Sequence, residues 1–336
     1  MKAIGYTTTG SVEVLKDLEL PKPAPGPRDL LVEVRAISVN PVDTKIRAGG
    51  GPGSPEGEAK ILGWDAAGIV TAVGAEVTLF KPGDEVYYAG SVDRPGANAE
   101  FHLVDERIVG RKSKKITFAE AAALPLTTIT AWELLFDRLK IPKQKTINGS
   151  LLITGGAGGV GSIVSQLARC LTNLTIIATA SRPETRAWCQ EMGAHHVIDH
   201  TQPLAAQVKA IMPGGVNYVL ALTRTETYFD QIIEAMAPQS ALGLIENVAA
   251  PLDINKLKPK NISLHWEFMF GRVRYETPDM FEQGVLLNEV SQLIEAGKIR
   301  STLRENLGPI NAANLKSAHE LLQSGKTIGK IVLEGF

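Results

Sequence analysis

Five glycines between Gly155 and Gly161 are the residues whose type and spacing most directly indicate chemistry. The run Gly156-Ala157-Gly158-Gly159-Val160-Gly161 is a variant of the G-x-G-x-x-G pattern. Glycine lets the chain turn tightly and lets a ligand approach the backbone, because no Cβ stands in the way. A helix that starts here would point its free N–H groups at a pyrophosphate. The run therefore predicts a dinucleotide site, and the alternative is a glycine-rich loop that binds nothing.

Ser181 and Arg182 follow the next apolar run, at the place where an NAD-binding fold usually has an acidic residue for the ribose 2′-hydroxyl. A hydroxyl and a cation stand there instead, and both suit a 2′-phosphate. We therefore interpret the cofactor as NADPH. The alternative is that Ser181 only caps the next helix, which has Pro183 in its first turn. Both can be true, since the serine can cap and also present its oxygen.

The elements that position these residues alternate between strands and helices. An apolar run at 151–154 precedes the glycines, and apolar residues at helical spacing follow them over 162–169. Such alternation predicts a doubly wound parallel sheet with helices on both faces. The nucleotide domain is expected over 125–268. Its further strands are expected at 175–180, 196–200, 217–222, 241–245 and 262–268, and its further helices at 184–192, 205–212 and 228–237.

The first part of the chain has short strand signals at 30–39, 68–74 and 84–88, punctuated by proline and glycine. This pattern predicts a partly open β-barrel, and this part should supply the substrate pocket because it has no nucleotide motif. Helical patterns at 118–124 and 131–139 lead into the nucleotide domain. The tail, with helices at 283–296 and 311–324 and a strand at 330–334, is expected to return to the barrel. One domain is thus predicted to consist of 1–124 plus 269–336 and to be interrupted by 125–268.

Composition excludes several classes of partner. The 35 basic and 36 acidic residues give a formal charge of -1, which provides no long-range attraction to nucleic acid or to an anionic membrane. No apolar run is long enough to span a membrane, and the N-terminus lacks the apolar core of a signal peptide. Cys170 and Cys189 do not suggest a disulfide framework. We expect a cytoplasmic protein that binds small molecules.

The chain contains five motifs spread over nearly its whole length: Asn40–Gly49, Leu62–Gly68, Leu124–Thr127, Gly158–Gly161 and Gly329–Leu333. In their sequence and order they resemble those of the medium-chain dehydrogenase/reductase superfamily. Within it the chain looks like the quinone oxidoreductase branch and is closest to the group often labelled zinc-type alcohol dehydrogenase-like. The resemblance implies an α/β fold in which a Rossmann domain is inserted into a GroES-like barrel domain. It also implies a homodimer that pairs sheet edges near 241–245 and 263–268.

The zinc ligands of that superfamily have no counterpart in this chain. Zinc alcohol dehydrogenases have a cysteine where this chain has Asn40, and a histidine where it has Trp64. Neither side chain replaces a thiolate or an imidazole, and both cysteines lie in the nucleotide half. The six histidines are not spaced as a metal cluster. The sequence therefore predicts no zinc.

Without zinc, hydride transfer from a nicotinamide needs an acceptor that requires little polarisation, such as a quinone or an α,β-unsaturated carbonyl. The resemblance implies that Asn40, Thr44 and Trp64 line the substrate pocket and that Thr127 lies by the nicotinamide. Asn40 offers an amide donor of the type wanted at a developing oxyanion. Trp64 offers a wall for a flat substrate, or else only packs in the core. Asp65 is interpreted mainly as structural.

The resemblance also implies which residues contact the cofactor. The pocket loop at 49–57 has no tyrosine, which family members show there, so a solvent proton is expected to complete the reduction. Two other functions stay open. One is a zinc-type alcohol dehydrogenase or carbonyl reductase, and the other is an NADPH-binding protein with little turnover. The implied cofactor contacts are Thr130, Gly158, Gly159, Val160, Ser181, Arg182, His200, Leu222, Thr223, Ile245, Asn247, Met269 and Phe270.

Overall fold

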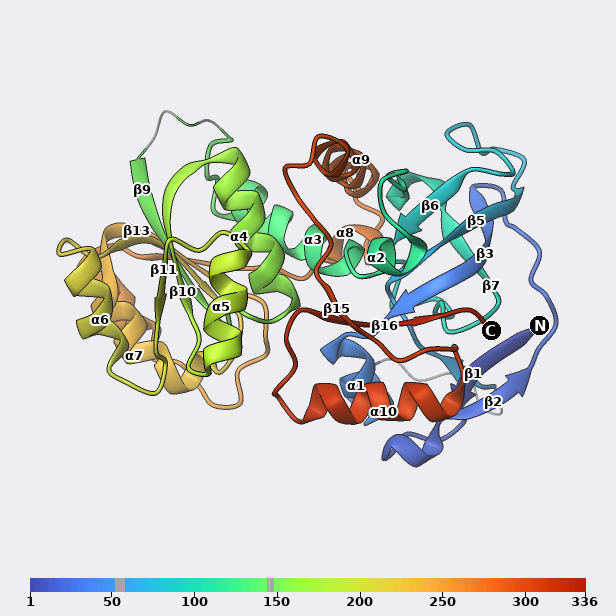
Figure 1. Ribbon diagram of the computed structural model, residues 1–336, viewed down its shortest axis with the longest axis horizontal. Coiled ribbons are helices and arrows are strands. Elements are labelled where there is room, and N and C mark those ends of the chain that lie inside the picture. The colour runs from blue at the N-terminus through green and yellow to red at the C-terminus, as the bar shows by residue number, and fades with distance from the viewer. Residues whose placement is uncertain (52–57, 144, 146–147) are drawn as a thin grey trace. The chain divides into compact units, whose positions relative to one another are not determined.

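The computed structural model describes residues 1–51, 58–143, 145 and 148–336 (Figure 1). The expected loop at 49–57 therefore lies largely outside the described residues. The chain divides into two compact units. Unit 1 is Met1–Ile129 with Phe270–Phe336, and unit 2 is Thr130–Met269. The sequence places these boundaries after 124 and after 268, so the first structural boundary falls inside a helix rather than before it.

Unit 2 is built on a six-stranded sheet in the order β11-β10-β9-β12-β13-β14. Every neighbouring pair in it is parallel. The chain starts at the central strand β9, moves outward to β11, and then returns to the other side of β9 with β12. This reversal confirms the predicted doubly wound sheet and creates the crevice in which such folds bind ligands. The strands are β9 (Asn148–Thr154), β10 (Asn173–Thr179), β11 (His196–Ile198), β12 (Val216–Ala221), β13 (Met236–Leu244) and β14 (Ser263–Trp266).

Helices cover both faces of this sheet (Figure 1). Buried side chains of α6 and α7, among them Leu204, Val208, Phe229 and Ile232, share one core cluster with strand residues such as Val219. Apolar residues at helical spacing form these faces because burying them removes them from water. The helices of unit 2 are α4 (Gly159–Leu171), α5 (Pro183–Glu191), α6 (Leu204–Ile211), α7 (Thr225–Ala235), the π-helix η3 (Glu133–Arg138) and the 3-10 helix η4 (Ile254–Lys260).

Unit 1 contains a mainly antiparallel sheet in the order β15-β16-β3-β5-β6-β8, with β7 also paired to β3, and a small sheet β2-β1-β4. The strand β16 near the C-terminus lies antiparallel to β3, with Val332 opposite Ser38. The tail therefore returns to the first part of the chain, as predicted. The strands are β1 (Lys2–Tyr6), β2 (Lys16–Glu19), β3 (Asp29–Ser38), β4 (Lys60–Ile61), β5 (Ala66–Val73), β6 (Glu85–Tyr88), β7 (Phe101–Asp105), β8 (Gly110–Arg111), β15 (Leu303–Asn306) and β16 (Lys330–Glu334).

Two helices near the expected pocket differ from the sequence prediction. The helix predicted from 131 already begins at Pro125, because proline is well suited to a first helical turn. A further helix, α1, begins after Asn40, where Asn40 and Asp43 form a capping box. The helices are α1 (Pro41–Arg47), α2 (Phe118–Ala122), α3 (Pro125–Trp132), α8 (Gly271–Arg274), α9 (Glu282–Glu295) and α10 (Ala312–Gln323), with 3-10 turns η1 (Val12–Val14) and η2 (Glu106–Ile108).

Across the described part of the chain, no helix combines the length and the apolar character that crossing a membrane requires.

Candidate active site

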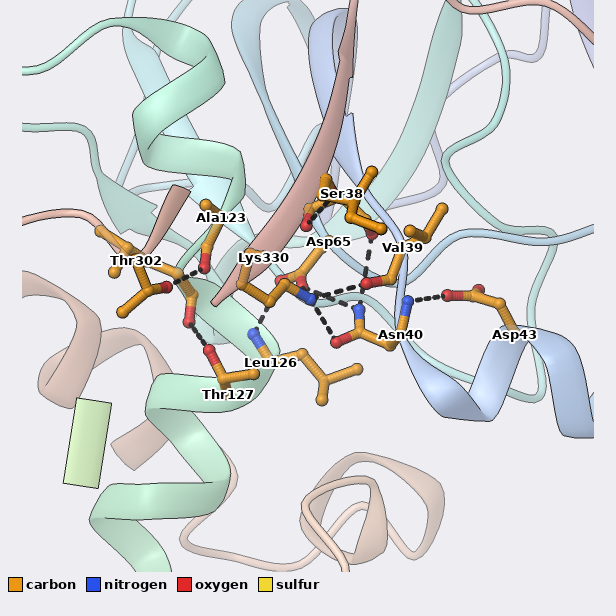
Figure 2. A network of polar contacts seen from close by, with 12 residues as sticks. Ser38, Val39, Asn40, Asp43, Asp65, Ala123, Leu126, Thr127, Thr302 and Lys330 are labelled. Carbon is orange, nitrogen blue, oxygen red and sulfur yellow. Dashed lines mark hydrogen bonds and ion pairs between the residues drawn. The ribbon is translucent and has the colours of Figure 1, made fainter. Parts of the chain in front are cut away.

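The side-chain amide of Asn40 lies in a buried polar network in unit 1 (Figure 2). Its Nδ2 donates to Asp65 Oδ2 at 2.8 Å and makes a longer contact of 3.5 Å with the carbonyl of Ser38. Its Oδ1 accepts from the ammonium of Lys330. Both ends of the amide are therefore engaged. The expected role of Asn40 as a donor to an oxyanion stays a prediction. The Nδ2 hydrogen that makes the long contact with Ser38 is the one that could take this role.

Lys330 and Asp65 form a buried ion pair at the centre of this network. Their Nζ and Oδ2 atoms are 3.0 Å apart, and the side chains are 4% and 0% exposed. Lys330 also donates to the carbonyl of Val39 at 2.8 Å. Asp65 Oδ1 accepts from the backbone N–H of Leu126, in the first turn of α3, at 2.7 Å. Asp65 therefore joins three segments that are distant in sequence, which agrees with its interpretation as structural.

Asp43 is a second buried carboxyl beside this pair. It accepts from the backbone N–H of Asn40 at 2.6 Å and of Gly63 at 3.1 Å. Burial raises the pKa of the Asp43 carboxyl to about 7, although the N–H of Asn40 and the charge of Lys330 pull it down. The two carboxyls thus share the neighbourhood of one ammonium, and Asp43 holds the loop of Gly63 against the start of α1.

Trp64, Thr44 and Thr127 are all nearly buried in unit 1. The indole Nε1 of Trp64 donates to the carbonyl of Ser91 at 2.8 Å, and its ring meets that of Phe270 edge to face, with centroids 6.1 Å apart. The hydroxyls of Thr44 and Thr127 donate to carbonyls one helical turn back, at 2.9 and 3.1 Å. Trp64 is 1% exposed, so its surroundings fit the core-packing interpretation at least as well as that of a substrate wall.

The donor set at these positions does not fit zinc. A structural or catalytic zinc takes thiolate, imidazole or carboxylate ligands. Here the amide of Asn40 and the carboxylate of Asp65 both bind an ammonium, and Trp64 offers an N–H that cannot coordinate. The described residues contain no group of three or more histidine, cysteine or acidic side chains placed to hold a metal ion.

In unit 2 the glycine run forms the turn between β9 and α4. Gly155 has φ +67°, which favours glycine, and a Cβ on Gly161 would lie 2.6 Å from the carbonyl oxygen of Gly155. A Cβ on Gly158 would meet no protein atom closer than 3.4 Å. Gly158 is the N-cap of α4 and has no capping side chain. The turn therefore leaves the first N–H groups of α4 open to an anion, and the surroundings of Gly158 fit a pyrophosphate.

Ser181, Arg182 and His200 lie together beyond the ends of β10 and β11. Ser181 Oγ is 3.4 Å from His200 Nε2, and Arg182 Nε is 3.2 Å from a carboxylate oxygen of Glu184. The N-cap of α5 is Arg182, so the alternative in which Ser181 caps this helix is wrong. Pro183 occupies the first turn as expected. The Arg182–Glu184 pair is largely exposed, so the guanidinium can exchange this partner for a phosphate at little cost.

The remaining expected cofactor residues occupy two kinds of place. Leu222 and Thr223 follow β12, and Ile245 and Asn247 follow β13, so they lie at the same carboxyl edge of the sheet as the glycine turn. The N–H of Leu222 bonds to Thr154 Oγ1 at 2.9 Å. The buried residues Thr130, Met269 and Phe270 instead lie at the two positions in the sequence where the chain passes from one unit to the other.

Lys330 is the residue of this site that sequence reasoning missed. It belongs to the closing motif Gly329–Leu333, but an isolated lysine at the start of a strand gives no signal of a buried charge. Its partners Asn40 and Asp65 are 290 and 265 positions away. A signal existed only in the apolar strand that follows it, which predicts that its neighbourhood is buried.

Comparison with known proteins identifies the relatives of this chain. Residues 26–130 match the alcohol dehydrogenase GroES-like domain, and residues 192–333 match the zinc-binding dehydrogenase family. A zinc-type alcohol dehydrogenase-like protein of Staphylococcus aureus is 42% identical over 99% of both chains. A crystal structure from Rhizobium etli, described as a candidate zinc-dependent alcohol dehydrogenase, is 56% identical with a TM-score of 0.96, covering 100% of this chain and 98% of that one.

A second solved structure, the Escherichia coli quinone oxidoreductase in complex with NADPH, is 26% identical with a TM-score of 0.83, over 99% of this chain and 100% of that one. The matches span both units and nearly the whole chain. The chain belongs to the medium-chain dehydrogenase/reductase superfamily and is an oxidoreductase of that superfamily with a Rossmann sheet and a GroES-like domain.

Proposed function

We propose that the protein is a zinc-independent, NADPH-dependent oxidoreductase that reduces quinones or α,β-unsaturated carbonyls by hydride transfer. The observation that carries this proposal is the buried Asn40–Lys330–Asp65 network, whose donor set does not fit zinc. The similarity to an NADPH-bound quinone oxidoreductase supports the same activity.

The chemistry follows from what the acceptor needs. Bound NADPH supplies a hydride. In a quinone or an enone, conjugation spreads the negative charge that this hydride brings onto a carbonyl oxygen, so no Lewis acid is required. The chain then has to hold the acceptor, exclude water and donate hydrogen bonds to that oxygen. Asn40 is the proposed donor, Thr44, Trp64 and Thr127 are the proposed pocket residues, and a solvent proton completes the reduction.

The choice of NADPH over NADH rests on Ser181 and Arg182. Positions 180–182, directly after β10, have no acidic residue to accept a ribose hydroxyl, and the hydroxyl of Ser181 and the cation of Arg182 follow the strand instead. His200 contacts Ser181 and completes a polar rim suited to a 2′-phosphate.

The test is NADPH consumption by the purified protein with a quinone, an enone and a simple ketone, before and after treatment with a chelator, together with metal analysis. We expect turnover of the quinone or the enone that the chelator does not change, and none of the ketone. One tight zinc per chain whose removal abolishes turnover would overturn the proposal. That outcome would favour a carbonyl reductase or an alcohol dehydrogenase, and alcohol dehydrogenase is the activity in the names of the 42% and 56% identical relatives. Tight NADPH binding without turnover of any acceptor would favour the binding-protein interpretation.

We also infer a homodimer in the cytoplasm. The strand β14 has only β13 as a neighbour within the described sheet, whereas β13 is paired on both sides. Of the two edges expected to pair, 241–245 is therefore internal and 263–268 is the one available. Trp266 and Phe268 are 49% and 50% exposed beside it. Light scattering should give a mass of two chains, and a monomer at micromolar concentration would contradict the inference.

A further inference from the structure

The ammonium of Lys330 has all three of its hydrogens committed. It donates to the carbonyl of Val39, to Oδ1 of Asn40 and to Oδ2 of Asp65. Figure 2 shows these contacts converging on the end of the Lys330 side chain, between Asp65 and Asn40. Because the lysine is 4% exposed and its carboxylate partner 0%, solvent does not compete for these contacts. The charge is neutralised within the network and the geometry is held by three partners at once.

This arrangement dictates which way the amide of Asn40 faces. An ammonium can only donate and an ionised carboxylate can only accept. The amide must therefore turn its oxygen toward Lys330 and its nitrogen toward Asp65. The flipped amide would set its NH₂ against the ammonium and its oxygen against the carboxylate, and both contacts would be repulsive. Lys330 and Asp65 thus act as a pair that selects one of two orientations.

The selected orientation leaves one amide hydrogen weakly held. Of the two hydrogens on Nδ2, one bonds to Asp65 at 2.8 Å, and the other has only the 3.5 Å contact with the carbonyl of Ser38. An ammonium at the amide oxygen also draws electron density from the nitrogen, which makes this hydrogen a stronger donor. A substrate oxygen that carries developing negative charge is the kind of acceptor that such a donor stabilises.

We propose that Lys330 is a positioning residue that orients and polarises the amide of Asn40 so that its second N–H is offered to the carbonyl oxygen of the acceptor. This inference rests on the proposed reduction of quinones or enones. It adds a residue, in the last strand of the chain, whose charge the reaction uses without touching substrate or cofactor.

The test is the variant Lys330→Met, which keeps the length of the side chain and removes the charge. Burial raises the pKa of Asp65 and the charge of Lys330 partly offsets this, so the carboxyl binds a proton more readily once the ammonium is removed. A protonated Asp65 can donate as well as accept, so this pair no longer selects one orientation of the Asn40 amide. We expect kcat for an enone to fall about 10- to 100-fold, less than or equal to the loss of a whole oxyanion donor. KM for NADPH should change less than about twofold.

Lys112→Met is the matched control. Lys112 also lies in unit 1, and its side chain is 5% exposed. Its Nζ pairs with a carboxylate oxygen of Glu85 at a distance of 3.0 Å, so it belongs to a different ion pair from that of Lys330. We expect it to leave kcat unchanged. Should Lys330→Met fail to fold, Lys330→Gln takes its place, since glutamine restores polarity but both donates and accepts and so does not select an orientation. A folded Lys330 variant with wild-type kcat for every acceptor overturns the proposal.

A second readout separates this inference from the proposed function. In protein labelled with ¹⁵N at asparagine, the side-chain signals of Asn40 are assigned by their loss in Asn40→Asp. We expect slow hydrogen exchange for one amide proton in the wild type and fast exchange for both in Lys330→Met. Wild-type protein that turns over neither acceptor refutes the proposed function alone. Asn40 signals that do not respond to Lys330→Met refute the orientation by Lys330, whatever the activity.

Discussion

The candidate ligand sites of the two units are built in opposite ways. In unit 2 the site is made of backbone, since glycines leave space and the start of α4 presents N–H groups, while its charged side chains are half exposed. In unit 1 it is made of side chains, since Asn40, Asp65 and Lys330 are each less than 5% exposed and bind one another. The site in unit 2 is therefore open to solvent, whereas the side chains of the site in unit 1 are shielded from solvent. A backbone site depends on positions that lack a side chain, and a side-chain site depends on every one of its side chains being present.

Asp65→Ala should break the side-chain site most severely. It leaves the buried ammonium of Lys330 without its counter-charge and the N–H of Leu126 without its acceptor. Removing one partner of a buried ion pair lowers the free energy of unfolding by about 3–5 kcal/mol. Urea denaturation measures this free energy. The exposed pair of Asp230 and Lys256 is the control, and Asp230→Ala should cost less than about 1 kcal/mol. If the double variant Asp65→Leu with Lys330→Met is no more stable than Asp65→Ala, the uncompensated charge is not the cause.

Gly158→Ala should break the backbone site without breaking the fold. The new Cβ meets no protein atom closer than 3.4 Å, but it occupies the space in front of α4. We expect NADPH to bind about 10- to 100-fold more weakly, about 1.4–2.7 kcal/mol, with an unchanged melting temperature. Gly161→Ala should instead lower the melting temperature, because its Cβ would lie 2.6 Å from a carbonyl oxygen. Gly214→Ala meets nothing within 4 Å and serves as the control. Equal NADPH affinity in Gly158→Ala and Gly214→Ala would contradict the placement of the pyrophosphate.

Arg182→Ala tests how much a single exposed charge contributes to the candidate cofactor site in unit 2. Its ion pair with Glu184 is exposed, and exposed ion pairs contribute little to stability, so the loss should concern mainly the cofactor. We expect roughly tenfold weaker NADPH binding, about 1.4 kcal/mol, and almost no change for NADH. Fluorescence titration with both cofactors measures it. Arg169→Ala removes an equal charge from the last turn of α4 and controls for net charge. Equal losses for NADPH and NADH would show that Arg182 does not touch the phosphate.

Unit 2 also contains a buried carboxyl pair, Glu133 and Glu267. Of the variants considered, Glu267→Gln should change the measured free energy least. Burial and the neighbouring Glu133 raise the pKa of Glu267 to about 9, against the pull of Arg138 at 2.8 Å. The folded state therefore holds a proton that the unfolded state releases near its ordinary pKa, so this group's stabilisation falls as pH rises from about 4.5 to 9. Glutamine keeps the hydrogen bond to Arg138 and does not titrate. At pH 9 we expect the variant to gain about 1 kcal/mol over the wild type, and at pH 5 less. Urea denaturation at both values checks this, and a pH-independent difference would contradict it.

The same contrast explains how much the sequence could predict. The sheet of unit 2 and the positions of Ser181, Leu222 and Asn247 at its carboxyl edge follow from local periodicity, since each strand ends where its apolar run ends. The network of unit 1 does not, because Lys330 meets partners more than 260 positions away and lysine is seldom buried. The short helix α1 was also missed. Its capping box is a local signal, but the first residues of α1 were interpreted only as a family motif.

The place of β16 in the sheet has a consequence for biosynthesis. Unit 2 is one continuous segment, while unit 1 receives its last strands only after all of unit 2 has been made. On the ribosome, Asp43 and Asp65 are therefore translated long before Lys330, whose charge lowers the pKa of both. They must stay hydrated or protonated until Lys330 emerges, so the nascent chain can complete the fold of unit 2 before the proposed acceptor site forms. A chain that loses its last seven residues, from Lys330 to Phe336, would be expected to keep the glycine turn and lose the ordered amide of Asn40.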